Sequence, residues 1–505
     1  MKRIIYKLSL AAVLISMIVT SCTKDFEEIN TNPNNSPEAL PQQLLPPALI
    51  STMGYLQLRN RNFNNELMQV TVDASDAEGK VFRYDFRSNW ADYLYNGLYS
   101  ELTNIKDVYK NAHEKDSMTY KGISLICQSW MYSILSDTYG DVPYSQSNLA
   151  KEQGIFEPVF DSQKEIYLDI FEKLEEANTI LSSGAPTLVM TSADPIYAGN
   201  PALWRKFGNS LYLRLLLRVA HKSDVSAEVI AKIQDMLGAS ASKYPLINSV
   251  AESAVLKWTG EGALVSPLMS VRAQDYSSPA IAEFFIKNLV SWNDPRIDIP
   301  TWGGGTANRW RIAPSQGAYV GVPSGYAPGE NPVKRSYFYS TTSALTLMND
   351  AMTGLIFPYA EIRFIKAELM VKGIITGNAG TEYLNGVNAG IQYWLPAWPT
   401  ANTTTYLTDA DIQWDDAYTE EQKMAMVHLQ KYYALFLVDM QQWFEYRRTG
   451  LPVLPKGAGL RNGGVMPARM TYPVYVQSTN PTNYKLAVAA QGPDVISTQV
   501  WWQKP

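Results

Sequence analysis

Apolar side chains recur every three or four positions along much of this 505-residue chain, and this period constrains its fold more than any other feature. The pattern is clearest in two runs: Ile166, Ile170, Leu174, Ala177 and Leu181, and Trp204, Phe207, Leu211, Leu215 and Val219. This spacing places the apolar side chains on one face of a helix, which has to be buried against other elements. The sequence therefore predicts a mainly α protein.

Further helices are expected over residues 44–58, 90–111, 118–138, 280–290, 359–372 and 420–448. They come largely in neighbouring pairs, which favours a helical-repeat scaffold, although no sequence period of about 34 residues is present. The periodicity disappears over residues 290–350 and 452–505, where Gly, Pro, Ser and aromatic residues predict long loops with few short strands. Because such long loops are uncommon and often functional, we expect a ligand to bind there.

The N-terminus has the pattern of a signal peptide. Lys2, Arg3 and Lys7 precede an apolar run over residues 8–19, which is shorter than the ~20 residues of a membrane-spanning helix. Val-Thr-Ser before Cys22 resembles a lipobox, so residues 1–21 are expected to be removed and Cys22 to be acylated as the lipid anchor. The alternative is cleavage after a nearby small residue, with Cys22 incidental.

Composition excludes some functions and favours others. A formal net charge of −5, more negative once the signal is removed, gives no indication of nucleic-acid binding. Cys127, the second of two cysteines, lies in an apolar helical stretch, and we expect it to be buried and unreactive. The chain holds 31 Tyr and 13 Trp but only 3 His, a bias toward rings that pack cores and also stack on sugars and peptides.

No catalytic, metal or cofactor motif is found. His113, His221 and His428 lie in unrelated helical contexts, which disfavours a nucleophilic triad, and no zincin, CxxC or EF-hand pattern occurs. Glu361 and Glu368 share a helix face and could form an acid and base pair for glycoside hydrolysis. Structural ion pairs are the better interpretation, with partners among Arg214, Arg218, Arg447 and Arg448. We therefore expect no enzyme, no catalytic residues and no cofactor.

Several runs in this order resemble the SusD/RagB-like lipoproteins of Bacteroidota along nearly the whole mature chain. The runs are DFEEINTNPN at 25–34, DTYGDVPY at 137–144, DPIY at 194–197, WRKFGNSL at 204–211, DPR at 294–296, YVGVPSG at 319–325, AEIRFIKAE at 360–368, WFEYRRTG at 443–450 and PARMTYP at 467–473. The acidic segment at 23–28 also resembles a surface-export signal of such lipoproteins.

The resemblance implies a tetratricopeptide-like right-handed helical superhelix with an irregular, loop-rich half. It implies an outer-membrane, cell-surface lipoprotein that acts as the lid of a SusC-like TonB-dependent β-barrel transporter and binds oligosaccharides or peptides. The mature chain is expected to be a single domain over residues 22–505. In it, 22–40 form a tether, 41–240 and 355–450 the scaffold, and 290–350 and 452–505 the ligand-facing part.

Two loops carry the groups that bind sugars, which are aromatic faces, amides and guanidinium groups. Loop 301–311 offers Trp302, Asn308, Trp310 and Arg311 as ligand contacts, with loop packing or contact with the barrel as the alternative for its tryptophans. Segment 80–87 is a second candidate, with Arg83 and Tyr84 as ligand contacts, and Trp90 just after it is expected in the core. Peptide capture, a surface glycoside hydrolase and a subunit that only gates the barrel stay open as alternatives.

Overall fold

Helices dominate the structure, a computed structural model that describes residues 38–73, 75, 77–297 and 308–504. Cys22 and Trp302 lie outside these residues. Residues Pro41–Pro505 form one unit and Met1–Leu40 another, and the account below concerns the first. No helix among the described residues is both long enough and apolar enough to span a membrane.

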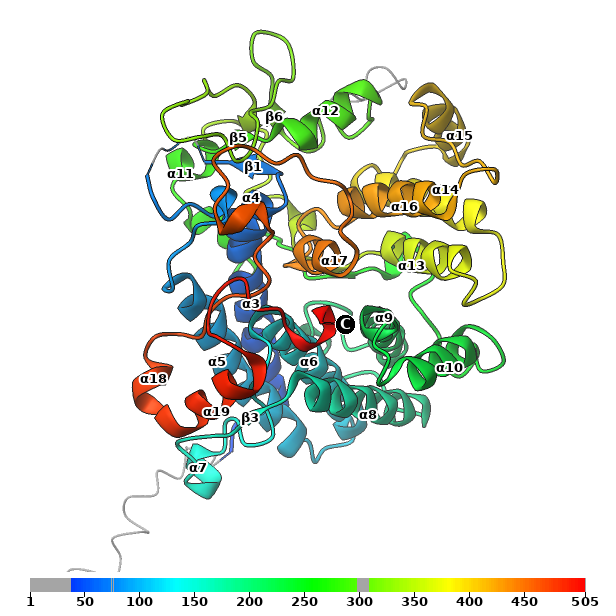
Figure 1. The fold of residues 1–505 in the computed structure, drawn as a ribbon. Coiled ribbons are helices and arrows are strands. Elements are labelled where there is room, and N and C mark those ends of the chain that lie inside the picture. The colour runs from blue at the N-terminus through cyan, green and yellow to red at the C-terminus, as the bar shows by residue number, and fades with distance from the viewer. Residues whose placement is uncertain (1–37, 74, 76, 298–307, 505) are drawn as a thin grey trace, which may run out of the picture. The chain divides into compact units, whose positions relative to one another are not determined.

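The long helices pack against their neighbours in sequence (Figure 1). The first group contains α3 (Pro41–Arg59), α5 (Trp90–Lys110), α6 (Ser117–Tyr139), α8 (Gln163–Ser182), α9 (Pro201–Val219) and α10 (Ser226–Leu237). The second contains α13 (Tyr359–Val371), α14 (Ala379–Trp394), α15 (Thr400–Asp409), α16 (Glu420–Ala434) and α17 (Gln441–Thr449). This arrangement confirms the predicted mainly α fold with helices in neighbouring pairs.

Short elements connect the loops to the helices. The described strands form antiparallel pairs: β1 (Thr71–Val72) with β5 (Ala280–Ile281), β2 (Val142–Pro143) with β3 (Phe160–Asp161), β4 (Ala254–Val255) with β8 (Leu355–Phe357), and β6 (Ile312–Ala313) with β7 (Tyr337–Phe338). The short helices are α4 (Asn65–Leu67), α7 (Ala150–Gln153), α11 (Ala273–Ser277), α12 (Glu283–Ser291), α18 (Val476–Thr479) and α19 (Pro481–Gln491).

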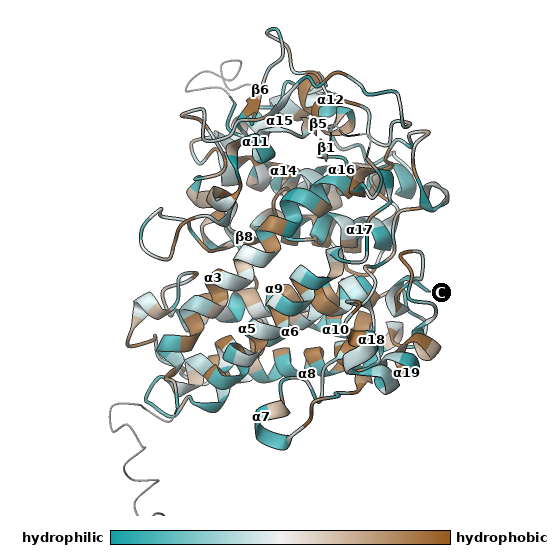
Figure 2. Cartoon of the chain, turned by 90° about the vertical axis from the view of Figure 1, so that its left-hand side faces the viewer, coloured by the Kyte–Doolittle hydropathy of each residue, from teal (hydrophilic) through white to brown (hydrophobic). Residues whose placement is uncertain are grey.

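Local signals explain where several helices begin and end. Ser162 and Glu165 form a capping box at the start of α8, and Asn200 accepts hydrogen bonds from the second and third backbone N–H groups of α9. Gly140 and Gly450 end α6 and α17 with positive φ angles of 85° and 72°. The helices bury their apolar faces, which Figure 2 shows as brown ribbon on the packed sides of the bundle. Cys127 lies fully buried in α6, as predicted.

One helix prediction and one loop prediction are wrong. Residues 420–448 are not one helix, because α16 ends at Ala434 and α17 begins at Gln441. Between them Leu437 and Asp439 have positive φ, and the carbonyl of Asp439 accepts a hydrogen bond from Asn60 Nδ2 at 2.6 Å. The segment after residue 452, predicted as loops, contains α18 and α19, the latter with Pro481 at its first position.

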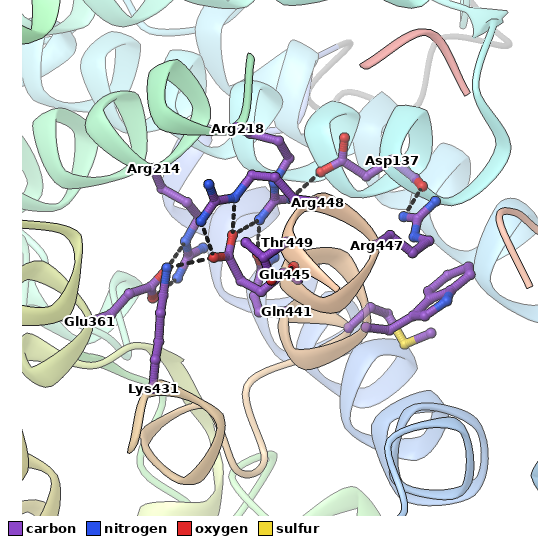
Figure 3. Close-up of polar contacts among 12 residues, drawn as sticks. Asp137, Arg214, Arg218, Glu361, Lys431, Gln441, Glu445, Arg447, Arg448 and Thr449 are labelled. Atoms are coloured by element: carbon purple, nitrogen blue, oxygen red, sulfur yellow. Dashed lines mark hydrogen bonds and ion pairs between the residues drawn. The ribbon is translucent and has the colours of Figure 1, made fainter. Parts of the chain in front are cut away.

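Buried ion pairs join the two groups of helices (Figure 3). Glu361 of α13 accepts a hydrogen bond from Arg214 Nε of α9 at 2.7 Å, and Glu368 accepts two from Arg448 of α17, both at 2.7 Å. Arg218 of α9 pairs with Asp137 of α6 and, at 3.2 Å, with Glu445 of α17. The structural interpretation of Glu361 and Glu368 is therefore confirmed.

Glu368, His428 and Glu445 are the described cluster with donor atoms close enough to hold a cation. Arg448 binds both carboxylates and Lys431 binds Glu445 at 2.7 Å, so their charge is already compensated. Burial alone would raise the pKa of Glu368, but Arg448 and His428 hold it well below its usual range. Burial lowers the pKa of His428 to about 4 and keeps this ring neutral at pH 7. The three residues therefore belong to a network of buried ion pairs.

Gly386 tests how closely α13 and α14 approach. A Cβ at this position would lie 2.7 Å from Cε1 of the buried Phe364 ring, whereas a Cβ at Gly54 in α3 would meet only Pro267 Cβ at 3.9 Å. We expect Gly386→Ala to lower the free energy of unfolding by about 1–3 kcal/mol through overpacking. Gly54→Ala, the matched control, should raise it by up to about 1 kcal/mol. Equal urea midpoints for the two variants would contradict this packing.

Glu361→Gln tests the central ion pair, because it keeps the shape of the side chain and removes its charge. Arg214 would be left buried without a counter-charge, so we expect a loss of about 3–5 kcal/mol in the free energy of unfolding, measured by urea denaturation. Asp275→Asn breaks the exposed Arg272–Asp275 pair and should leave stability almost unchanged. A Glu361→Gln variant as stable as the control would show that the pair contributes nothing.

Candidate functional site

Trp310, one of the predicted ligand contacts, is fully buried. Its ring stacks on Phe285 with centroids 5.6 Å apart and lies 4.9 Å from the centroid of Phe436. The guanidinium carbon of Arg296 lies 4.6 Å from the centroid of the Trp310 ring, and Arg296 forms an ion pair with Asp294. In this structure Trp310 packs the core, which is the alternative interpretation given above. Trp302 of the same loop lies outside the described residues.

Asn308 and Arg311 form a turn in this loop. The Asn308 side chain is buried, and it donates to the carbonyl of Ile312 and accepts from the Ile312 amide at 2.7 Å. Both Asn308 and Arg311 have positive φ angles, 69° and 57°. Arg311 is half-buried, donates at 3.4 Å to the Asn308 carbonyl, and has its pKa lowered by burial. Of this pair, Arg311 therefore keeps some exposed side chain, while Asn308 shapes the backbone.

Arg83 and Tyr84 of the second predicted segment are buried as well, with 4% exposure each. Arg83 donates from Nε to the carbonyl of Tyr326 at 3.1 Å and lies 4.8 Å from the ring centroids of both Phe82 and Tyr326. Tyr84 ends the short 3₁₀ helix Val81–Arg83 in a left-handed conformation. These two side chains hold the segment against the body.

The same segment nevertheless borders a cavity of about 410 Å³. Its wall is formed by Arg59, Ala77, Glu78, Gly79, Lys80, Arg87, Asn89 and Trp90. The predicted segment 80–87 therefore contributes its two ends, Lys80 and Arg87, to the wall. Arg83 and Tyr84, in the middle of the segment, are buried. We call this the Arg59–Trp90 cavity.

Two helices and one loop build the Arg59–Trp90 cavity. Arg59 is the last residue of α3, and Trp90 is the first residue of α5. Asn89 precedes Trp90, is exposed, and makes no capping hydrogen bond with its side chain. The cavity thus presents a half-buried indole, a free amide and guanidinium groups, which are the groups that sugar recognition requires.

The loop beside the cavity is held by polar contacts. Lys80 pairs with Asp73 at 2.6 Å, and the Gly79 amide donates to Asp85 Oδ2 at 3.1 Å. Behind it, Glu66 accepts from the Phe82 amide at 3.2 Å, and burial raises its pKa to about 8. Glu66 is therefore mainly protonated at pH 7, which reduces negative charge behind this loop.

A second cavity of about 410 Å³ lies in the loop-rich part, between α12 and the segment after α17. Its wall includes Phe284, Pro323, Val453 and Pro455, with the amide of Asn288 among them. It is more apolar than the Arg59–Trp90 cavity and contains no arginine among its lining residues. Its wall carries one aromatic ring, that of Phe284, and polar groups that include the amides of Gln69 and Asn288, but no guanidinium group.

Neither cavity has the arrangement of a hydrolase. Glycoside hydrolysis uses two carboxylates about 5–10 Å apart on either side of the bond. Among the described residues, each cavity has a single carboxylate in its wall, Glu78 in one and Glu283 in the other. The described residues of each wall thus lack the carboxylate pair that this mechanism uses.

A family model and several solved structures match this protein over most of the chain. The SusD-like family model described as "Starch-binding associating with outer membrane" matches residues 33–473. A search of curated protein sequences finds no match.

Solved structures have the same fold. A SusD homolog from Bacteroides fragilis is 23% identical with a TM-score of 0.75, and the alignment covers 92% of this chain and 100% of that one. A SusD homolog from Bacteroides uniformis is 24% identical, with a TM-score of 0.71 and coverage of 91% and 99%. A chitin-binding SusD homolog from Flavobacterium johnsoniae is 19% identical, with a TM-score of 0.76 and coverage of 92% and 98%.

These alignments extend over nearly the whole of each solved chain, so they include both the paired helices and the loop-rich part. They support the predicted tetratricopeptide-like scaffold. Because the family model matches most of the chain, this protein belongs to the SusD-like family of outer-membrane-associated nutrient-binding proteins.

Proposed function

We propose that this protein is a lipid-anchored lipoprotein of the outer membrane that captures glycans at the cell surface for a SusC-like TonB-dependent transporter and acts as its lid. Family membership supports the nutrient-binding role. Cys22 and the segment around it, quoted above, support the anchor. The protein does no covalent chemistry in this proposal, because Glu361 and Glu368, the two carboxylates that share a helix face, are held in ion pairs.

The observation that carries the glycan proposal is the composition of the Arg59–Trp90 cavity. Carbohydrate C–H faces stack on aromatic rings such as Trp90, and hydroxyls take hydrogen bonds from amides and guanidinium groups such as Asn89 and Arg87. Arg311, half-buried at the end of loop 301–311, stays a proposed contact. A lid has to release its ligand to the barrel, and a shallow site of this kind suits transient binding.

Asn89→Ala tests the cavity without disturbing the core, because the Asn89 side chain is exposed and makes no cap. In a glycan-array screen followed by calorimetry, we expect this variant to bind the best oligosaccharide about two- to tenfold more weakly, the loss of one hydrogen bond. Trp90→Ala should weaken binding further. Asn349→Ala removes an exposed amide outside the cavity and should leave binding unchanged.

Other outcomes, in this binding screen or in a transport assay, would change the proposal. Binding of peptides but of no glycan would assign the protein to peptide capture. Release of reducing sugar from any bound glycan would show that it is a hydrolase. Transport that survives the loss of both Asn89 and Trp90 would favour a subunit that only gates its barrel.

Cys22→Ser tests the anchor. Without the thiol no acyl chain can be attached, and each buried methylene contributes about 0.8 kcal/mol to membrane binding, so we expect the folded protein in the soluble fraction. Cys127→Ser, which keeps the anchor and alters the buried thiol of α6, should stay with the membrane. A Cys22→Ser protein that still sediments with the outer membrane would show that another contact is sufficient.

A further inference from the structure

Arg59 is half-buried, and no carboxylate of the described residues pairs with it. Its two hydrogen bonds are long, 3.4 Å from Nη1 to Asn62 Oδ1 and 3.5 Å from Nη2 to the carbonyl of Trp90. Its Nε is buried and has no acceptor. A buried charged donor that is left unsatisfied costs free energy and needs an explanation.

Four deeply buried arginines show how the chain compensates a buried positive charge. Arg214, Arg218, Arg296 and Arg448 are at most 3% exposed in their side chains, and each forms an ion pair with an aspartate or glutamate. Arg59 differs from them in location as well, because it lies in the wall of the Arg59–Trp90 cavity. This position places its guanidinium within reach of a ligand in the cavity.

The rings around Arg59 fix its orientation. Its guanidinium carbon lies 4.8 Å from the centroid of Trp90 and 4.6 Å from that of Tyr93, so the planar group is held between two aromatic residues. Trp90 packs in turn on Phe63, and Tyr93 on Tyr55. A guanidinium held in this way loses little further side-chain freedom when it binds a planar anion.

The surroundings add positive charge. Arg87 is exposed in the same wall and makes no ion pair among the described residues. Lys80 of the same wall forms an ion pair with Asp73. Glu78 is the acidic group of the described wall, and Asp92 acts on Arg59 only beyond ion-pair distance. Burial lowers the pKa of Arg59, as expected for a cation without a close counter-charge.

We propose that the Arg59–Trp90 cavity selects acidic glycans, with a uronate carboxylate or a sulfate ester of the sugar bound by Arg59 and Arg87. This inference rests on the proposed glycan-binding function and adds the class of ligand to it. Guanidinium groups bind carboxylate and sulfate oxygens with paired, charge-assisted hydrogen bonds. Trp90 supplies the apolar surface for the ring that carries the anion.

Simple anions test the cavity first, with the full mature protein. Thermal unfolding is measured in sodium galacturonate, galacturonate methyl ester, sodium sulfate and sodium chloride at matched ionic strength. Because a ligand that binds the native state raises the unfolding temperature, we expect galacturonate or sulfate to raise it above the methyl ester and chloride. Arg59→Gln should abolish the difference. No difference between the four solutes, or one that survives in Arg59→Gln, would overturn the proposal.

Matched oligosaccharides identify the source of the anion. Oligogalacturonides are compared with their methyl esters, and sulfated galactan fragments with desulfated ones. We expect one acidic member to bind at least about tenfold more tightly than its neutral partner, and to lose about tenfold in Arg87→Gln. Arg87 is exposed, so this variant keeps the fold even if Arg59→Gln does not. Arg335→Gln, an exposed arginine outside the cavity, is the matched control.

The outcomes separate the two proposals. Binding of neutral glycans with equal or greater affinity would overturn the acidic-ligand inference and leave the glycan-binding function intact. Stabilisation by an acidic peptide with no binding of any glycan would overturn both. Tighter binding of an acidic glycan that Arg87→Gln weakens and Arg335→Gln does not would support both.

Discussion

The fold depends on charges buried between its two groups of helices. Arg218 and Arg448 meet at Glu445, and through Asp137 and Glu368 they tie α9 and α17 to α6 and α13. Removing such charges from water is expensive, and only mutual pairing compensates it, so the helices are stable in one relative position. Apolar packing would tolerate small shifts between the same helices. The network therefore provides a rigid base for the loops.

Periodicity and residue chemistry predicted much of this base. The apolar spacing located α5, α6, α8, α9 and α13 to within a few residues, and carboxylates on a buried helix face indicated pairs with arginines. The break between α16 and α17 could not be predicted, because the segment between them is held by a hydrogen bond from Asn60, hundreds of residues earlier, to the carbonyl of Asp439. Long-range demands of this kind leave no local signal.

The site was harder to predict than the fold. Segment 80–87 does border the cavity, but Arg83 points inward and Arg87 outward. A left-handed residue at Tyr84 reverses the chain between them, so residue type alone could not distinguish the two arginines. The indole of Trp310 has the chemistry of a sugar contact, but aromatic residues of α12 and of the segment after α16 pack around it in the core. Nothing in the sequence marked Arg59 as a site residue, because its lack of a carboxylate partner among the described residues is visible only in the folded structure.

The described strands have a consequence for how such a protein changes over evolutionary time. Each of the described antiparallel pairs is only two or three residues long, so few backbone hydrogen bonds attach a loop to the helices. A loop can then be lengthened or exchanged at the cost of those few bonds, while the ion network below is untouched. The Arg59–Trp90 cavity, in contrast, lies at the ends of two scaffold helices, so a change of ligand there also acts on residues that hold the fold.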